Sequence, residues 1–186
     1  GMGTSLHAAM IGSHLLEALA DLPSRVENAS EFRYRNPVLD RHTLVVSVTQ
    51  SGETADTLAA MEGAALKKAR QLWVGEVEGS QASRMAEGSL FINAGQEIGV
   101  ASSKTMTSTS VVLYLLAIHL AKARGVFGRE AEREAVSELA GLPGKMSALI
   151  GTEKRLEELA ARISQKRHLL YLGRGAMLPA ALEGAL

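Results

Sequence analysis

Cysteine is absent from the 186-residue chain, and aromatic residues are rare. The first absence excludes disulfide bonds, a thiol nucleophile and thiolate metal sites among these residues, and it is compatible with a cytoplasmic protein. Because 46% of the chain is hydrophobic but only 4% is aromatic, aliphatic and alanine side chains must build the core. Twenty basic residues balance twenty acidic ones. The chain therefore has no net positive charge that would attract nucleic acid or an anionic membrane, and we expect neither as a partner.

Long hydrophobic runs and familiar cofactor motifs are also missing. The longest apolar run, Val111–Ala121, is interrupted by His119 and is too short to span a bilayer. Neither the G-x-G-x-x-G dinucleotide pattern nor the P-loop ending occurs. The five histidines lack metal-binding spacing, so we interpret them as packing or surface residues. The sequence therefore predicts neither a cofactor nor a metal.

The most informative stretch is Leu44–Thr57, where a strand, a polar turn and a helix follow one another. Leu44–Val48 is typical of a buried strand, and Ala55–Met61 of an alanine-rich helix. The turn between them, here named the central turn, consists of Thr49, Gln50, Ser51, Gly52, Glu53 and Thr54. Neutral hydrogen-bond donors ahead of a helix N-terminus suit a phosphate group. The alternative is an ordinary βα turn with a Ser/Thr N-cap, but the concentration of donors favours the phosphate site.

Strands and helices alternate along the chain. Beyond the central turn, short strands are expected at Leu72–Val77 and Leu90–Ile92. This alternation predicts an α/β fold with a parallel sheet and helices on both faces. A long helix, about Thr105–Arg124, is apolar on almost every side and is expected to be buried. Two further strands are expected, at Arg25–Ala29 and His168–Leu172.

The chain opens with a glycine-and-hydroxyl turn that leads into a helix, expected from about Ser5 to Ala20 with Thr4 or Ser5 as its N-cap. A turn of this kind usually follows a strand, so we expect the first strand of the domain to precede residue 1. The pattern Gly-x-Gly-x-x-Leu-x-Ala-Ala recurs from Gly173. The repeat predicts a first lobe over residues 1–150, followed by a linker helix and the start of a second lobe over residues 151–186.

A third polar loop, residues 93–104, precedes the long helix. Its Lys104 is the one cation beside a candidate binding loop, where it either serves an anion or is a solvated surface lysine. Three carboxylates, Glu53, Glu97 and Glu183, lie near the polar turns. Each is a candidate general base or a brace for its loop, and we favour the bracing role.

Three motifs in this order resemble the sugar isomerase (SIS) domain family: S-E-F-R-Y-R at Ser30–Arg35, T-Q-S-G-E-T-A-D-T at Thr49–Thr57, and G-Q-E-I-G-V-A-S-S-K at Gly95–Lys104. Their combination is similar to the isomerase half of the glutamine–fructose-6-phosphate aminotransferases over essentially the whole chain. The resemblance implies a flavodoxin-like, three-layer fold, two SIS lobes per isomerase half and a homodimer. It also implies that fructose 6-phosphate or glucosamine 6-phosphate binds in the first lobe.

The resemblance assigns substrate-binding roles to eight residues. The central turn would hold the phosphate, the opening turn would contact the sugar, and the third loop would line the far side. In that order the residues are Thr49, Gln50, Ser51 and Thr54; Thr4 and Ser5; Val100 and Ser102. Two positions depart from the family, which commonly has Ser where Thr49 stands and Cys where Met2 stands.

The resemblance also places the acid–base residues of the isomerase beyond Leu186, so the catalytic residues stay unassigned. It implies a glutaminase domain in the full-length protein. Two other functions stay open: a two-lobe SIS sugar-phosphate deaminase or isomerase without that domain, and a SIS sugar-phosphate sensor. A cysteine-led amidotransferase domain upstream would favour the aminotransferase, whereas a helix-turn-helix segment upstream would favour the sensor.

Overall fold

The computed structural model describes residues 1–99 and 102–186. Within these residues a sheet of three parallel strands, in the order β1-β2-β3, forms the centre of the molecule. The strands are β1 (Leu44–Val48), β2 (Arg70–Gly75) and β3 (Gly88–Phe91). Val46 lies opposite Leu72, and Val74 lies opposite Leu90. The parallel pairing and the helical crossovers confirm the α/β class.

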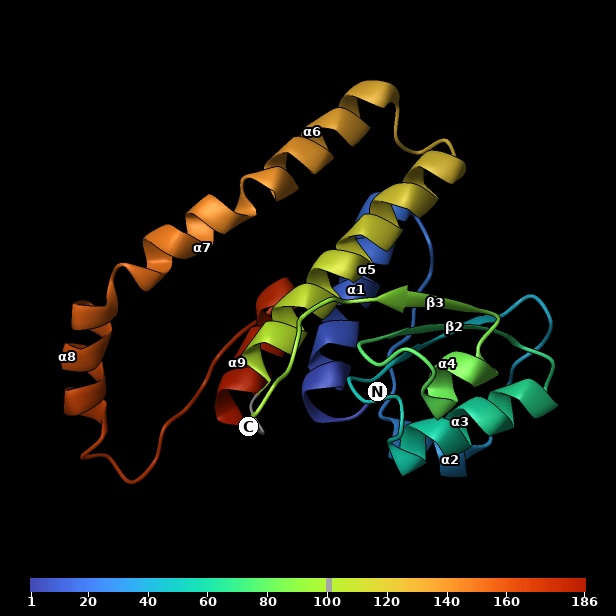
Figure 1. Cartoon of the computed structure of the whole chain (residues 1–186), viewed down its shortest axis with the longest axis horizontal. Coiled ribbons are helices and arrows are strands. Elements are labelled where there is room, and N and C mark those ends of the chain that lie inside the picture. The colour runs from blue at the N-terminus through green and yellow to red at the C-terminus, as the bar shows by residue number, and fades with distance from the viewer. Residues whose placement is uncertain (100–101) are drawn as a thin grey trace.

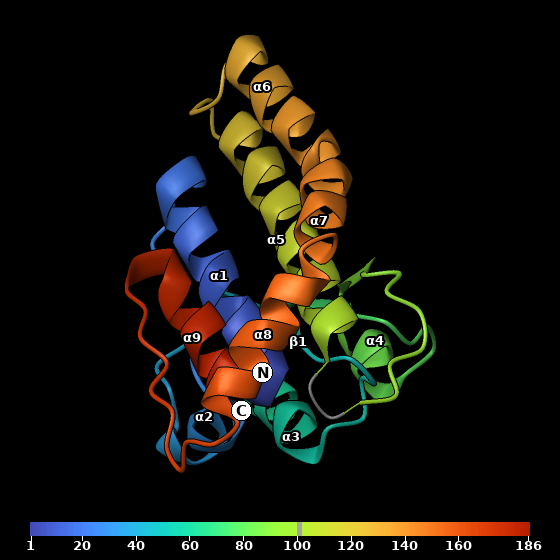
Figure 2. The same ribbon diagram turned by 90° about the vertical axis from the view of Figure 1, so that its left-hand side faces the viewer.

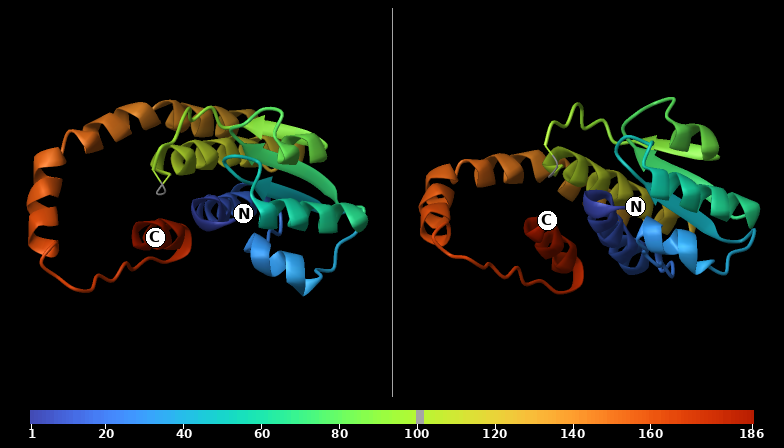
Figure 3. Two further views of the ribbon diagram at one scale, coloured as in Figure 1. Left: turned by 60° about the horizontal axis from the view of Figure 1, so that its bottom comes forward. Right: turned by 90° about the horizontal axis from the view of Figure 1, so that it is seen from below.

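Helices cover both faces of this sheet (Figures 1 and 3). α1 (Gly3–Ala20) and α5 (Ser103–Ala123) pack against each other on one face. α3 (Ala55–Leu66) and α4 (Gln81–Met85) cover the other face, and α2 (Ala29–Arg35) packs on α3. The three layers of the predicted fold are therefore present.

Alternating side chains of β2 supply the two halves of the core. Val74 points toward α1 and α5, where it packs with Val48, Ile92 and Leu113. Trp73 points the other way and packs with Leu58, Met61 and Ala82 beneath α3 and α4. The alternation follows from the two-residue period of a strand, which sends successive side chains to opposite faces.

α5 is the one helix among the described residues that is long and apolar enough to cross a membrane, by length and composition alone. The core helix of a soluble protein passes the same test. In this structure α5 packs along α1, and Leu113, Ala117 and Ala121 are buried. The expected burial is therefore only partial: α5 buries one face within the domain, whereas its Leu115 is 44% exposed.

An arm of three helices leaves the end of α5. It consists of α6 (Arg129–Ala140), α7 (Leu142–Ile150) and α8 (Glu153–Ile163), and no residue of these three described helices is buried. The chain then returns through a 3₁₀ turn, η1 (Gly175–Met177), to α9 (Leu178–Ala185), which packs against α1. Figure 1 shows the arm away from the sheet, and Figures 1 and 2 show α9 beside α1.

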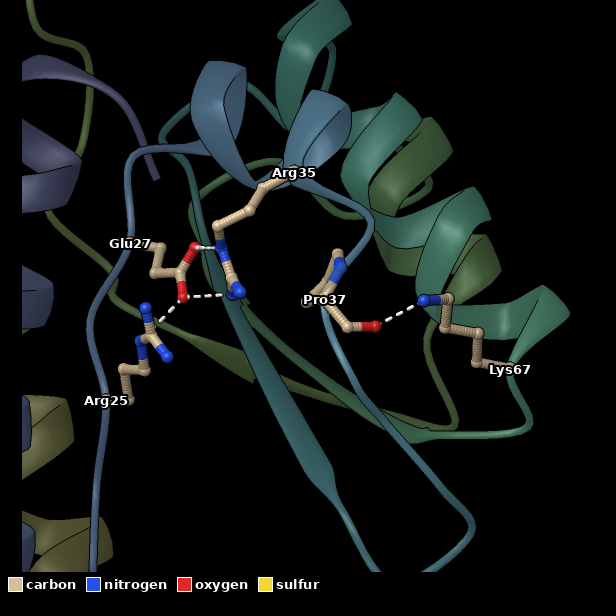
Figure 4. Close-up of polar contacts among 5 residues, drawn as sticks. All are labelled: Arg25, Glu27, Arg35, Pro37 and Lys67. Carbon is tan, nitrogen blue, oxygen red and sulfur yellow. Dashed lines mark hydrogen bonds and ion pairs between the residues drawn. The ribbon is translucent and has the colours of Figure 1, made fainter.

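The strands expected at Arg25–Ala29 and His168–Leu172 are not formed. Neither segment has a neighbouring strand to pair with among the described residues, so no ladder of backbone hydrogen bonds develops. Residues 22–28 are instead an extended connection to α2. Its Glu27 carboxylate binds both Arg25, with Nε and Oε1 2.7 Å apart, and Arg35 (Figure 4). Pro37 lies in the connection from α2 to β1, and its carbonyl oxygen accepts a hydrogen bond from Lys67 at the end of α3.

The two glycine turns that repeat in the sequence share one backbone geometry. Gly3 has φ of +47°, and its counterpart Gly175 has φ of +56°. The residues before them are extended, Met2 at φ −129° and Arg174 at φ −139°. Positive φ is a conformation that glycine adopts without a steric penalty. α1 begins at Gly3 with Met2 as its N-cap, so Thr4 and Ser5 lie in its first turn rather than capping it.

Gly75 gives the most direct test of how tightly the sheet is packed beneath the central turn. A Cβ at this position would lie 2.1 Å from Trp73 Cζ2 and 2.3 Å from the Thr49 carbonyl oxygen. Gly75→Ala should therefore lower the free energy of unfolding by about 1–3 kcal/mol, as overpacking does. Urea denaturation measures the change. The control is Gly63→Ala in α3, where nothing lies within 4 Å and helix propensity predicts a gain of about 0.5–1 kcal/mol. Equal effects of the two substitutions would contradict the prediction.

Candidate functional site

Because all three strands are parallel, the loops that follow them lie at one edge of the sheet. These are residues 49–54 after β1, residues 76–80 after β2, and the segment after β3 that leads to α5. The start of α1 reaches the same edge, since a Cβ on Gly1 would lie 2.9 Å from the Val48 carbonyl oxygen. The loops that carry the predicted site residues are therefore brought together from distant parts of the sequence.

The 49–54 loop is held from within by Thr49. Its hydroxyl oxygen accepts hydrogen bonds from the Gly52 N–H at 2.7 Å and from Trp73 Nε1 at 3.3 Å. Gly52 has φ of +71°, and a Cβ there would lie 2.1 Å from Ser80 Oγ, so the turn requires glycine. The Gly52 carbonyl oxygen accepts from the Ala82 N–H at 3.0 Å, which fastens the loop to α4.

Several donors in this loop have no acceptor among the described residues. Thr54 is the N-cap residue of α3, yet its side chain makes no cap hydrogen bond. The Gln50 amide group makes no hydrogen bond to any described residue, and Ser51 Oγ only accepts, from the Glu53 N–H at 3.1 Å. Unpaired hydroxyl, amide and backbone N–H donors ahead of a helix form an anion-binding arrangement.

Two carboxylates near the loop, those of Glu53 and Asp56, make structural contacts. Glu53 Oε1 accepts from the Gln81 N–H at 2.8 Å, and so braces α4 as predicted. Asp56 in the first turn of α3 pairs with Arg33 of α2, with 3.2 Å between Oδ1 and Nη1. The positive charge of Arg33 thus compensates the negative charge of Asp56, the one acidic residue in the first turn of α3.

The first turn of α1 is linked to α9 by Glu183. Thr4 Oγ1 donates to Glu183 Oε1 at 2.7 Å, and His7 Nδ1 lies 2.6 Å from Glu183 Oε2. Glu183 is thus a brace, as predicted, while His7 has a specific partner that the sequence interpretation missed. No local signal could identify this pair, because the two residues are 176 positions apart.

The loop after β3 is held by two carboxylates. Glu76, which follows β2, accepts from the Ala94 N–H at 2.8 Å and the Gly95 N–H at 3.0 Å. Glu97 Oε2 accepts from the Thr105 N–H at 2.9 Å and from its hydroxyl at 3.2 Å, so it braces the start of α5. Lys104 Nζ donates to the Gln96 carbonyl oxygen at 2.6 Å and is therefore a loop contact rather than a purely solvated lysine.

The last two predicted site residues are Val100 and Ser102. Ser102 is buried and is the N-cap residue of α5. Val100 lies outside the described residues. The seven predicted site residues in the described part of the chain lie on loops or helix starts at the same edge of the sheet.

Hydrogen bonding keeps the Glu97 carboxylate ionised. The Thr105 N–H, with additional contributions from the Thr105 hydroxyl and the Lys104 charge, lowers the pKa of Glu97 below its ordinary value of 4.5. A carboxylate that is ionised at neutral pH and occupied by donors suits a brace better than a general base.

The fold defines a parallel-sheet α/β domain whose polar loops gather at the carboxyl edge of the sheet. The family model of the SIS domain matches residues 1–119, so the chain belongs to the SIS domain family.

Curated relatives extend the similarity to the whole chain. A glutamine–fructose-6-phosphate aminotransferase [isomerizing] from Bacteroides thetaiotaomicron is 44% identical over 184 residues, covering 99% of this chain and 30% of the relative. The enzyme of the same name from Thermococcus kodakarensis is 46% identical over 186 residues, covering 100% of this chain and 31% of the relative. The chain thus spans about 30% of the length of the curated relatives it matches.

A solved structure matches the chain almost completely. It is the C-terminal domain of glucosamine-fructose-6-phosphate aminotransferase from Francisella tularensis, which is 33% identical with a TM-score of 0.95. The match covers 98% of this chain and 52% of the other. The predicted family resemblance is confirmed in both sequence and fold.

The bracing role of Glu97 predicts a specific pH dependence. Since its pKa is lowered by folding, its stabilisation is present above about pH 4.5 and is lost as the pH falls through the folded value. Glu97→Gln should therefore be less stable than wild type at pH 7, and the difference should shrink in acid. Thermal unfolding between pH 7 and pH 3 measures it. The control is Glu78→Gln, whose side chain makes no hydrogen bond or ion pair with a described residue. A stability difference for Glu97→Gln that is constant with pH would contradict the assignment.

Proposed function

We infer that this chain is part of the isomerase domain of a glutamine–fructose-6-phosphate aminotransferase and binds a hexose 6-phosphate at the carboxyl edge of its sheet. The observation that carries the proposal is the 49–54 loop, whose hydroxyl and amide donors have no acceptors within residues 1–99 and 102–186 and precede α3. The aminotransferase relatives, at 41–46% identity over the whole chain, support this function over a stand-alone deaminase or a sensor.

The proposed roles follow the position of each residue at the edge. Thr49, Gln50, Ser51 and Thr54 hold the phosphate, together with the N-terminus of α3. Thr4 and Ser5, in the first turn of α1, contact the sugar. Val100 and Ser102 line the far side. Glu183 supports the sugar contact by fixing the Thr4 hydroxyl, to which it is hydrogen bonded.

Neutral donors are sufficient for such a site. Hydrogen bonds to a charged phosphate are about twice as strong as those between neutral groups, and the N-terminus of a helix adds partial positive charge. A lysine is not required, which agrees with Lys104 being bound to a backbone carbonyl oxygen. The site therefore recognises the phosphate by geometry as much as by charge.

The remaining features of the proposal concern the full-length protein. Ammonia released from glutamine by a glutaminase domain would convert fructose 6-phosphate to glucosamine 6-phosphate. We propose that residues 151–186 link the first SIS lobe (residues 1–150) to a second one and begin it, and that the protein is a cytoplasmic homodimer. The shared backbone geometry of the turns at Gly3 and Gly175 supports the second lobe.

The phosphate site is tested by removing two of its hydroxyl groups. Ser51→Ala combined with Thr54→Ala removes hydrogen bonds to a charged group that are worth about 1.5–3 kcal/mol each. The dissociation constant for fructose 6-phosphate should rise at least roughly a hundredfold, as measured by calorimetry. Ser137→Ala with Ser147→Ala, on the exposed arm, is the matched control. Wild-type affinity in the Ser51/Thr54 double variant would place the phosphate elsewhere.

The chain of 186 residues should bind substrate without isomerising it. Its carboxylates at the edge are braces, and a positioned acid or base typically contributes about 10²–10⁴-fold to the rate. Incubation with fructose 6-phosphate, followed by a coupled glucose 6-phosphate dehydrogenase assay, should show no turnover above background. Rapid turnover that disappears in Glu97→Gln would make Glu97 a base and overturn this assignment.

A further inference from the structure

The only tryptophan of the chain, Trp73, lies directly beneath the 49–54 loop, which is the proposed phosphate loop. Trp73 is completely buried, and its ring packs with Leu58, Met61 and Ala82. Phe91 meets it edge to face, with ring centroids 5.9 Å apart and an interplanar angle of 79°. These contacts alone describe an ordinary core residue.

Two glycines make room for the indole at this position. A Cβ on Gly75 would lie 2.1 Å from Trp73 Cζ2, and one on Gly52 would lie 3.3 Å from the same atom. Gly52 belongs to the phosphate loop and Gly75 to the strand beneath it. The ring is therefore confined between the loop and the sheet, and its orientation is fixed.

The fixed ring directs its Nε1–H at the hydroxyl oxygen of Thr49, 3.3 Å away. The Gly52 N–H donates to the same oxygen at 2.7 Å. A threonine hydroxyl has two acceptor lone pairs and one hydrogen, so these two donors occupy both lone pairs. The hydroxyl hydrogen remains. Thr49 is only 4% exposed, and none of the described residues accepts that hydrogen.

We propose that Trp73 is a positioning residue for the phosphate site, which it serves by making Thr49 a hydrogen-bond donor only. With both lone pairs of its oxygen occupied, the Thr49 hydroxyl can satisfy its hydrogen only on an acceptor such as a phosphate oxygen. The inference rests on the proposed function. It adds a reason why the Thr49 hydroxyl donates to the bound group rather than accepting from it.

A double-mutant cycle separates this role from simple packing. Trp73→Phe keeps an aromatic ring but removes the N–H, and Thr49→Val removes the hydroxyl while keeping the shape. Thr49→Val should bind fructose 6-phosphate roughly tenfold to a hundredfold more weakly than wild type, the loss expected for one hydrogen bond to a charged group. Trp73→Phe should weaken binding by at most the same factor, because it acts through Thr49. In the Thr49→Val background, Trp73→Phe should cause no further loss, because the two residues act as one unit.

The matched control is Phe91→Leu. This change removes the edge-to-face partner of the indole but not its N–H, so the melting temperature should fall while the dissociation constant stays within about twofold of wild type. This control shows whether a weaker core alone can reproduce the effect.

The single tryptophan also provides a direct spectroscopic readout. One indole N–H signal is expected in a ¹⁵N correlation spectrum; Thr49→Val should shift it in the free protein, and fructose 6-phosphate should shift it in wild type. An unmoved signal, or a Trp73→Phe effect on affinity that is the same in both Thr49 backgrounds, would overturn the positioning role and leave the proposed function intact. Absence of fructose 6-phosphate binding by wild type would instead overturn the proposed function, and this inference with it.

Discussion

The hydroxyl oxygen of Thr49 is the point at which the sheet and the loop are joined. It accepts one hydrogen bond from the loop, the Gly52 N–H, and one from the strand below, the Trp73 indole. Because β1 ends at Val48, Thr49 is the first residue of the loop, and its contacts decide how the following residues leave the sheet. The left-handed turn at Gly52, the position of Ser51 and the start of α3 all depend on it.

Acidic and neutral side chains have different roles at this edge of the sheet. Glu76 and Glu97 hold the loop after β3, while Glu53 holds α4 and Glu183 holds the start of α1. Each carboxylate is occupied by N–H or O–H donors from the protein. The hydroxyl and amide groups of the 49–54 loop are the ones that we propose bind the anion. The arrangement explains how a site for a phosphate can tolerate several carboxylates at the same sheet edge.

Much of this could be predicted from the sequence, because the signals are local. Alternating strands and helices indicated the parallel sheet, and the turn at 49–54 marked its edge. The pairing of His7 with Glu183 and the contact of Trp73 with Thr49 join distant positions, so no periodicity or motif contained them. The strands expected at Arg25–Ala29 and His168–Leu172 failed for a related reason: a strand needs a neighbour, and the pattern of one segment does not reveal whether a neighbour exists.

The central claim is that the phosphate binds at the 49–54 loop, and amide shift mapping tests it most directly. Fructose 6-phosphate and fructose should be titrated separately into ¹⁵N-labelled protein. We expect the amides of residues 50–56 to shift with fructose 6-phosphate and far less with fructose. Largest shifts around the arginines that bind Glu27, or equal shifts with both sugars, would contradict it.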